Sequence, residues 1–306
     1  MTNSAGLDGS AGVGATADSA GSAGARATGP AAGNAGGSAR ASQPSSTRES
    51  KLAPARDCVS GRQDLPAVPA PRMDGASTVF VLASASPARA ATLRSAGIEP
   101  LIRVSNADED AVLARFPNSG SAEGAPAKVV ALAEAKAANV VPLISATELL
   151  AFASDQDMVR PTEAIVVACD SMLEVDGSLL GKPHSPEVAF DRIRQLSGND
   201  VTLHTGHAIV HLRISDDGKT VEVTDQHAAS CATTVHFTQL DDDEIRAYIA
   251  TGEPLEVAGS FTIDGLGGPF IAGVTGDPHS VVGISLPLVR RIAREVGVFW
   301  PSLWNR

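Results

Sequence analysis

The sequence is poor in aromatic residues, in cysteine and in long hydrophobic runs. Aromatic residues make up 4% of the 306-residue chain, and there are three cysteines. Cys58, Cys169 and Cys231 are odd in number and widely spaced, so they predict neither a disulfide framework nor a zinc site and favour a reducing, cytoplasmic compartment. No apolar run approaches the roughly 20 residues that span a bilayer, so we expect no membrane association.

Basic residues are also in deficit. The chain carries 24 Lys and Arg against 35 Asp and Glu, a formal net charge of −11 at pH 7. This balance disfavours a nucleic-acid polymer or an anionic membrane as the main partner. A small polyanion, held by a few local cations and a metal ion, remains compatible with it.

Residues 1–75 lack the side chains that build a core. They are dominated by Ala, Gly, Ser, Pro and Thr, with very few aromatic or large aliphatic residues. Such a segment buries too little apolar area to offset its ordering entropy, so it is predicted to be a disordered tail. Residues 76–306 are left as the folded part, a length that suits one α/β unit with insertions.

The folded part opens with a pattern of strand, two-serine turn and helix over residues 79–97. The apolar run 79–83 predicts a buried strand, and Ser86 and Pro87 are typical first residues of a helix. Ser84, Ser86 and Arg89 would then surround free backbone N–H groups at the positive end of a helix dipole. The turn is therefore either a phosphate pocket or an ordinary capped helix start.

Apolar periodicity and turn residues divide the remaining sequence into alternating helices and strands. Residues 111–126 are predicted to be a loop. The predicted strands are 99–104, 164–169, 172–175, 178–180, 201–212, 220–223 and 228–238, and the predicted helices are 127–140, 186–196, 242–250 and 287–296. Residues 146–153 are predicted to be either a short inserted helix or a partly mobile loop.

Several charged residues are candidates for chemistry. Asp170 ends a buried strand, where α/β folds place functional groups, and Lys182 is fixed between a glycine and a proline. Glu109 belongs to an acidic cluster that is either a metal ligand or a solvated turn. Lys136 lies on a helix, where a lone lysine is usually a surface residue. The histidines match no metal-binding spacing.

Seven short motifs, in order, resemble the Maf-like family of nucleoside triphosphate pyrophosphatases. Each motif is weak alone, but their order and spacing over residues 79–297 are specific. The motifs are Ser84-Ala85-Ser86-Pro87-Ala88-Arg89, Asp108-Glu109, Leu132-Ala133-Glu134-Ala135-Lys136-Ala137, Cys169-Asp170-Ser171, Gly181-Lys182-Pro183, Tyr248-Ile249-Ala250-Thr251-Gly252-Glu253-Pro254 and Ala258-Gly259-Ser260-Phe261.

The resemblance implies a two-lobed α/β fold with a mixed sheet and a central cleft, often dimeric. It implies a hydrolase that uses Mg²⁺ or Mn²⁺ to cleave a nucleoside triphosphate between its α- and β-phosphates. Asp170 would activate the attacking water, and Glu109 would hold the metal together with Asp170. Ser84, Ser86, Arg89, Lys136 and Lys182 would bind the phosphates. The alternative is a non-catalytic nucleotide-binding regulator of cell division.

The sequence departs from the family pattern on the side expected to bind the base. Ala88 replaces an arginine or a bulky residue, and Asp264 stands where pyrimidine-type members tend to have Gln and methylguanine-type members Glu. With Ser171, these residues fit neither subgroup. The phosphate chemistry is therefore predicted, whereas the preferred base is left open.

Overall fold

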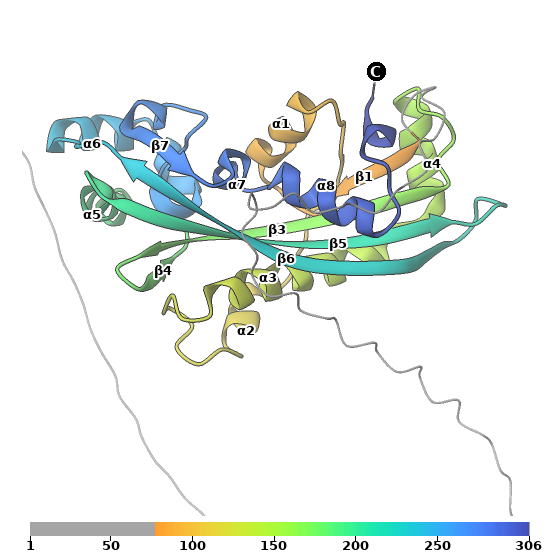
Figure 1. Cartoon of the computed structure of the whole chain (residues 1–306), viewed down its shortest axis with the longest axis horizontal. Coiled ribbons are helices and arrows are strands. Elements are labelled where there is room, and N and C mark those ends of the chain that lie inside the picture. Colours follow the sequence, from red (N-terminus) through yellow and green to blue (C-terminus); the bar gives the residue numbers. More distant parts are fainter. Residues whose placement is uncertain (1–76, 306) are drawn as a thin grey trace, which may run out of the picture. The chain divides into compact units, whose positions relative to one another are not determined.

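The computed structural model describes residues 77–305 and contains one mixed β-sheet (Figure 1). The strand order is β2-β1-β3-β5-β6-β7, and β4 pairs with β3 beside this path. β1 is parallel to β2 and β3, while the other pairs are antiparallel. The strands are β1 Thr78–Leu82, β2 Leu101–Ile102, β3 Glu163–Val175, β4 Ser178–Leu180, β5 Asp200–Ile214, β6 Val221–Phe237 and β7 Ile271–Thr275.

Helices cover both faces of this sheet. Figure 1 shows α3 under one face and α1 and α8 over the other, with α5 and α6 near one end of the long strands. The α-helices are α1 Pro87–Ser95, α2 Glu109–Leu113, α3 Ala125–Val140, α4 Ala146–Asp155, α5 Pro186–Leu196, α6 Asp242–Ala250, α7 Pro278–Val282 and α8 Leu286–Glu295. The short 3₁₀ helices are η1 Val141–Leu143, η2 Glu253–Glu256, η3 Ala258–Ser260, η4 Gly268–Phe270 and η5 Trp300–Leu303.

Strand β3 divides its side chains between two cores. Val166 and Ala168 pack in the core on the α3 face, whereas Ile165 and Val167 pack in the core beneath α1 and α8. Alternation along a strand produces this division, and burial on both faces explains the continuous apolar run. A third core, around α5 and α6, begins further along the same strand at Leu173. The predicted α/β class with a mixed sheet is confirmed.

One edge of β3 changes partner at its centre. β1 pairs with residues 163–167 and β4 with residues 173–175, while β5 runs along the other edge. Within the described chain, residues 168–172 therefore have β5 as their only paired strand. This is where the chain from β1 turns away towards α1.

Several elements differ from those predicted. Residues 221–237 form one continuous strand, β6, so the prediction of two separate strands at 220–223 and 228–238 is wrong. The ladder between β5 and β6 contains a β-bulge opposite His211 and Leu212. The helix α2 lies partly in the predicted loop 111–126. α7 and β7 were not predicted, because elements of five residues show too few periods.

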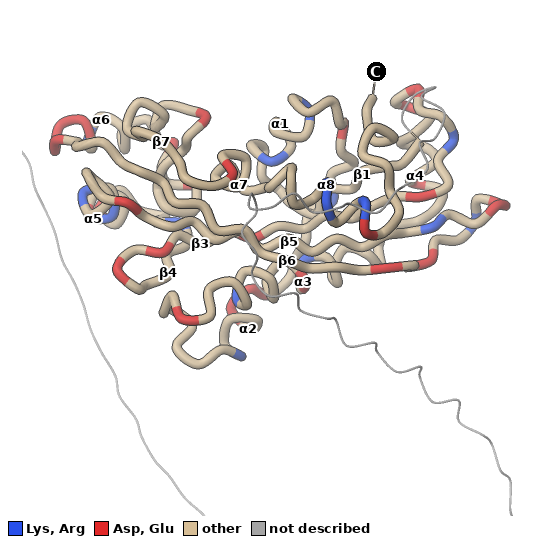
Figure 2. Tube along the Cα trace, viewed as in Figure 1, with Lys and Arg blue, Asp and Glu red and all other residues tan. Residues whose placement is uncertain are grey.

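Charge and cysteines add further detail. Figure 2 shows Lys and Arg interspersed with Asp and Glu, and acidic residues gathered at the start of α6 and in the turn between β5 and β6. Cys169 is buried and free, whereas Cys231 is disulfide-bonded, so the expectation that the cysteines form no disulfide is wrong for Cys231. The predicted disordered tail, residues 1–75, lies outside the described residues.

Among the described helices, none is long and apolar enough by itself to cross a membrane. One bent pair, Ala125–Leu143 with Ala146–Asp155, would meet the test by length and composition only.

A chain of hydrogen bonds crosses the sheet at the start of β3. Glu163 Oε1 accepts from the Thr78 hydroxyl at 2.9 Å, and Glu163 Oε2 lies 3.0 Å from Nε2 of the buried His211. The Thr78 hydroxyl also meets that of Ser302 at 2.9 Å. Burial raises the pKa of Glu163, but the hydrogen bonds from His211 and Thr78 outweigh burial and lower it below the ordinary value.

Glu163→Ala should reduce the free energy of unfolding by about 2 kcal/mol at pH 7, because two polar partners lose their acceptor. A carboxylate with a lowered folded-state pKa stabilises the protein above its unfolded pKa, about 4.5 here, and this contribution is lost as the pH falls. The difference between wild type and variant in urea denaturation should therefore narrow below about pH 4.5. A difference that stays constant down to pH 3 would contradict this account.

Candidate active site

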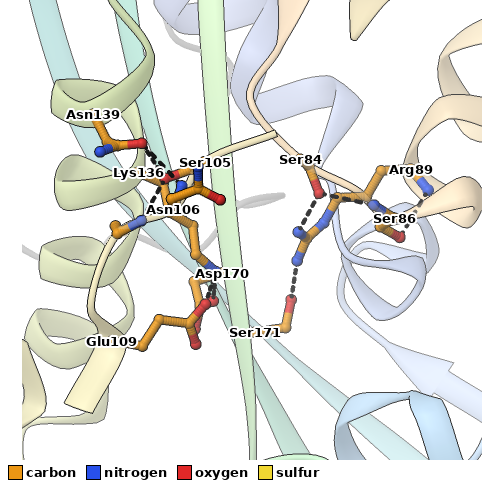
Figure 3. A network of polar contacts seen from close by, with 11 residues as sticks. Ser84, Ser86, Arg89, Ser105, Asn106, Glu109, Lys136, Asn139, Asp170 and Ser171 are labelled. Carbon is orange, nitrogen blue, oxygen red and sulfur yellow. Dashed lines mark hydrogen bonds and ion pairs between the residues drawn. The ribbon is translucent and has the colours of Figure 1, made fainter. Parts of the chain in front are cut away.

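Three charged side chains meet on the α3 face of the sheet. The Nζ of Lys136 donates a hydrogen bond to Oδ1 of Asp170 and lies 2.9 Å from Oε1 of Glu109 (Figure 3). The Lys136 and Asp170 side chains are 14% and 10% exposed, whereas that of Glu109 is 53% exposed. Lys136, which the family resemblance assigns to phosphate binding, is thus a largely buried counter-ion of two carboxylates rather than the surface residue that a lone helical lysine usually is.

A glycine in β5 allows α3 to come this close. Asp170 is paired in register with Gly206, and a Cβ built on Gly206 would lie 2.1 Å from the carbonyl oxygen of Val129. No larger residue fits between the strand and the backbone of α3. A glycine inside a strand is a sequence signal for such an approach, although the sequence does not tell which segment approaches.

Hydrogen bonds of the segment that precedes Glu109 fix its position. Glu109 opens α2, whose N-cap Asp108 accepts a hydrogen bond from Ala111 N–H at 2.9 Å. Further back, Asn139 Oδ1 on α3 accepts from Asn106 N–H at 2.9 Å and from the Ser105 hydroxyl at 3.3 Å. Asn139 lies one helical turn beyond Lys136, so α3 positions both partners of the ion pair. Sequence reasoning missed Asn139 because no local pattern marks it.

Burial dominates the electrostatics of this cluster. It raises the pKa of Asp170, although the positive charges of Lys136 and Arg89 act in the opposite direction. Burial also raises the pKa of the neighbouring Cys169 thiol to about 11, so this thiol is protonated at neutral pH. A carboxylate with a raised pKa has a stronger affinity for a proton than an exposed aspartate has.

A second cluster lies across β3 from the first (Figure 3). Arg89 donates from Nη1 to the Ser84 hydroxyl at 3.0 Å, from Nη2 to the Ser171 hydroxyl at 3.3 Å, and from Nε to the carbonyl of Gly283 at 2.8 Å. Asp170 and Ser171 are consecutive strand residues, so they point to opposite faces. The guanidinium is therefore fixed beside β3, one residue along from the aspartate.

The turn between β1 and α1 supplies the rest of this cluster. Ser86 is the N-cap of α1, and its hydroxyl accepts from Arg89 N–H at 3.4 Å, while Pro87 is the first helical residue. The Ser84 hydroxyl accepts from Ser86 N–H at 3.2 Å. The predicted strand, two-serine turn and helix are confirmed. Nine residues long, α1 presents the positive end of its dipole to this turn.

Buried polar groups of β5 bind Ser171 and the segment around Gly283, both of which contact Arg89. The Thr205 hydroxyl lies 3.0 Å from that of Ser171 and donates to the carbonyl of Ser280 at 3.0 Å. His207 Nε2 accepts from Ser285 N–H at 2.8 Å, and burial lowers the pKa of His207 to about 3. The imidazole is therefore neutral. Together these contacts fix the segment that carries Gly283, the acceptor of the Arg89 Nε proton.

Two predicted site residues take no part in either cluster. Lys182 is 48% exposed and pairs with Glu256 at 3.6 Å. Asp264 is exposed and forms no hydrogen bond or ion pair with other described residues. Of the predicted residues, those joined by direct contacts are Glu109, Lys136 and Asp170 on one face and Ser84, Ser86, Arg89 and Ser171 on the other.

The site residues lie within the segment that matches a known family. The model of the Maf-like protein family matches residues 79–296, and the chain belongs to this family. A protein of Rhodococcus jostii (strain RHA1) named nucleoside triphosphate pyrophosphatase is 50% identical over 228 residues, 74% of this chain and 96% of its own. A protein of the same name from Saccharopolyspora erythraea is 50% identical over 227 residues, 74% of this chain and 97% of its own.

Gly206→Ala should separate Lys136 from Asp170, because the new methyl group must displace either α3 or β5. We expect the free energy of unfolding to fall by about 2 kcal/mol or more. We also expect activity to fall by more than the loss of folded protein accounts for. Gly273→Ala is a matched control, since a Cβ there meets nothing within 4 Å. Thermal melts and activity assays of both variants would test this; a fully active Gly206→Ala enzyme would contradict the close packing.

Proposed function

We propose that this protein hydrolyses nucleoside triphosphates between the α- and β-phosphates, releasing a nucleoside monophosphate and pyrophosphate. The observation that carries the proposal is that two clusters meet at adjacent residues of β3. Asp170 belongs to the cluster of two carboxylates and a lysine, and Ser171 belongs to the cluster around Arg89 and the N-terminus of α1. The names of the relatives that match this chain support the same activity.

The cluster around Arg89 is suited to bind phosphate. Ser84, Ser86 and the backbone N–H groups at the start of α1 are donors, and the helix dipole favours an anion there. Arg89 is held by three acceptors before any ligand binds, so little ordering entropy is lost when it pairs with a phosphate. We assign this turn to the part of the triphosphate that leaves as pyrophosphate.

Asp170 is the residue best suited to activate water. Its raised pKa favours proton uptake, and Lys136 orients the carboxylate through a hydrogen bond to Oδ1. Water attacks the α-phosphorus, its proton passes to Asp170, and the bond to the bridging oxygen breaks as pyrophosphate leaves. Arg89 stabilises the charge that develops on the departing group.

The acidic cluster also fits a divalent cation. Glu109 and Asp170 already converge on one ammonium group, and carboxylate oxygens are the ligands that Mg²⁺ and Mn²⁺ prefer. Among the described residues no group of three or more His, Cys, Asp or Glu gathers, so Glu109 and Asp170 would hold the ion only together with phosphate oxygens and water. Such an ion would neutralise charge on the phosphates.

The base of the nucleotide is assigned to the remaining predicted residues. Ser171 lies on the face of β3 that Arg89 contacts. Ala88 is the residue before Arg89 in α1. Asp264 projects from the loop that precedes η4 and offers acceptors for base N–H groups. Lys182, close to Glu256, would contact a terminal phosphate. The protein is further proposed to act as a homodimer in the cytoplasm.

Asp170→Asn should reduce pyrophosphate release at least about 100-fold, because asparagine cannot take the proton. Asp216→Asn, an exposed turn residue, is the matched control and should retain full activity. The assay incubates each variant with Mg²⁺ or Mn²⁺ and a panel of nucleoside triphosphates and separates pyrophosphate from orthophosphate. Release of orthophosphate instead of pyrophosphate would indicate a different phosphoryl-transfer enzyme. Tight binding of a nucleotide without any product would indicate a non-catalytic nucleotide-binding regulator.

Glu109→Gln should raise the Mg²⁺ concentration needed for half-maximal activity by about tenfold or more, while saturating Mg²⁺ restores part of the turnover. Glutamine retains the size of the side chain but is a weak ligand for a hard cation. Glu123→Gln, an exposed residue of the loop before α3, serves as the control. If wild type and Glu109→Gln needed the same Mg²⁺ concentration for half-maximal activity, Glu109 would not be a ligand of the proposed metal ion.

A further inference from the structure

A line of hydroxyl groups leads from Arg89 into the sheet. Arg89 Nη2 donates to the Ser171 hydroxyl at 3.3 Å (Figure 3). The Ser171 and Thr205 hydroxyls lie 3.0 Å apart, and that of Thr205 donates to the carbonyl of Ser280 at 3.0 Å. Thr205 and Ser280 are completely buried. The line therefore ends at a backbone acceptor that is closed off from solvent.

This backbone acceptor determines where each hydroxyl hydrogen points. A carbonyl oxygen only accepts, so the single hydroxyl hydrogen of Thr205 is used on Ser280. The hydrogen between Thr205 and Ser171 must then come from Ser171. The Ser171 oxygen consequently turns its lone pairs, and not its hydrogen, towards Arg89 Nη2. Thr205 thus makes Ser171 an acceptor for the guanidinium.

Ser84, the other hydroxyl that contacts the guanidinium, has the opposite arrangement. Its oxygen accepts from Arg89 Nη1 at 3.0 Å and from Ser86 N–H at 3.2 Å, which occupies both lone pairs. Its own hydrogen meets no acceptor among the described residues and can be donated to a ligand. Of the two hydroxyls, Ser84 can therefore donate to an anion, whereas the hydrogen of Ser171 is used inside the protein.

Arg89 keeps donors for a ligand while it is held in place. Nε donates to the carbonyl of Gly283, Nη1 to Ser84 and Nη2 to Ser171, which uses three of its five N–H groups. Within residues 77–305 the other two, one on each terminal nitrogen, have no acceptor, and no carboxylate forms an ion pair with Arg89. Two such hydrogens match two phosphate oxygens, provided that the plane of the guanidinium is fixed.

A second threonine anchors α7 without contacting Ser171. The hydroxyl of Thr233, which is also buried, donates to the carbonyl of Asp277 at 3.1 Å and accepts from Asp277 N–H at 3.2 Å. Asp277 is the N-cap of α7, and Ser280 lies within this helix, so Thr205 and Thr233 both fix α7 to the sheet. Substitution of each threonine can therefore separate the anchoring of α7 from the orientation of Arg89.

We propose that Thr205 is a positioning residue that directs the hydroxyl hydrogen of Ser171 away from Arg89 and so holds the guanidinium in the plane that binds the pyrophosphate part of the substrate. The proposal rests on the proposed function and deepens it, because a buried residue that does not touch the substrate prepares the binding of the leaving group. In Thr205→Val the Ser171 hydroxyl loses its inward acceptor and rotates freely, so Arg89 Nη2 loses a fixed partner.

The test compares Thr205→Val with Thr205→Ser, which restores the hydroxyl, and with Thr233→Val, which loosens α7 alone. Calorimetry would give the Kd of inorganic pyrophosphate in the presence of Mg²⁺, and assays would give kcat and KM for pyrophosphate release. In Thr205→Val the Kd should rise about fivefold or more, and kcat/KM should fall by a similar factor. Thr205→Ser and Thr233→Val should match wild type per folded molecule.

A double-mutant cycle removes the group through which Thr205 acts. Ser171→Ala alone should raise the Kd of pyrophosphate at least as much as Thr205→Val, which keeps the proposal testable if Thr205→Val does not fold. In the Ser171→Ala background Thr205→Val should add little, because the hydroxyl that it orients is absent.

Four results would overturn the role of Thr205: additive effects in this cycle, equal losses in Thr205→Val and Thr233→Val, an unchanged Kd in folded Thr205→Val, or no binding of pyrophosphate by wild type. Pyrophosphate binding that changes as expected in a protein that releases no pyrophosphate from nucleoside triphosphates would instead refute the proposed function and leave the role of Thr205 supported.

Discussion

A charged aspartate in the centre of a sheet requires an opposite charge within reach, and this requirement organises the middle of the molecule. Removing the Asp170 carboxylate from water costs several kcal/mol, which the Lys136 ammonium offsets only if α3 lies almost against β5. Gly206 makes that approach possible. A buried pair of this kind adds little net stability compared with apolar residues of similar size. Its chemistry, rather than the stability of the fold, therefore accounts for its presence.

The alternation of β3 then determines how the chemistry is divided. Asp170 faces α3, and Ser171 faces α1, so the groups proposed to hydrolyse the substrate and those proposed to bind its phosphates lie on either side of a single strand. A compact ligand would reach only one face. An extended polyanion that passes the unpaired edge of β3, between the segments paired with β1 and β4, would reach both.

Local patterns predicted the parts of the site that depend on neighbouring residues. The turn from Ser84 to Arg89 was predicted because capping and proline placement are local. Asp170 was singled out because it follows a buried run, but the predicted strand end there is wrong, since β3 continues through Asp170 to Val175. The contacts between segments were not predictable in this way. Arg89 meets Gly283, 194 residues away, and no spacing rule connects them. The division of the site between two faces could have been deduced from the adjacency of Asp170 and Ser171 alone.

The two halves of the proposed site differ in how they are built. Among the groups assigned to the phosphates, Ser84, Ser86 and Arg89 are fixed by the cap of α1 and by contacts with β3, whereas Lys182 is half-exposed. Among the groups assigned to the base, Ala88 and Ser171 are on α1 and β3, whereas Asp264 is on an irregular loop whose shape depends on side-chain acceptors such as Glu253. A substitution in this loop can change its surface without moving Asp170 or Arg89. In the proposed site, the surface that would contact the base can therefore vary at this loop while the contacts of Asp170 and Arg89 are retained.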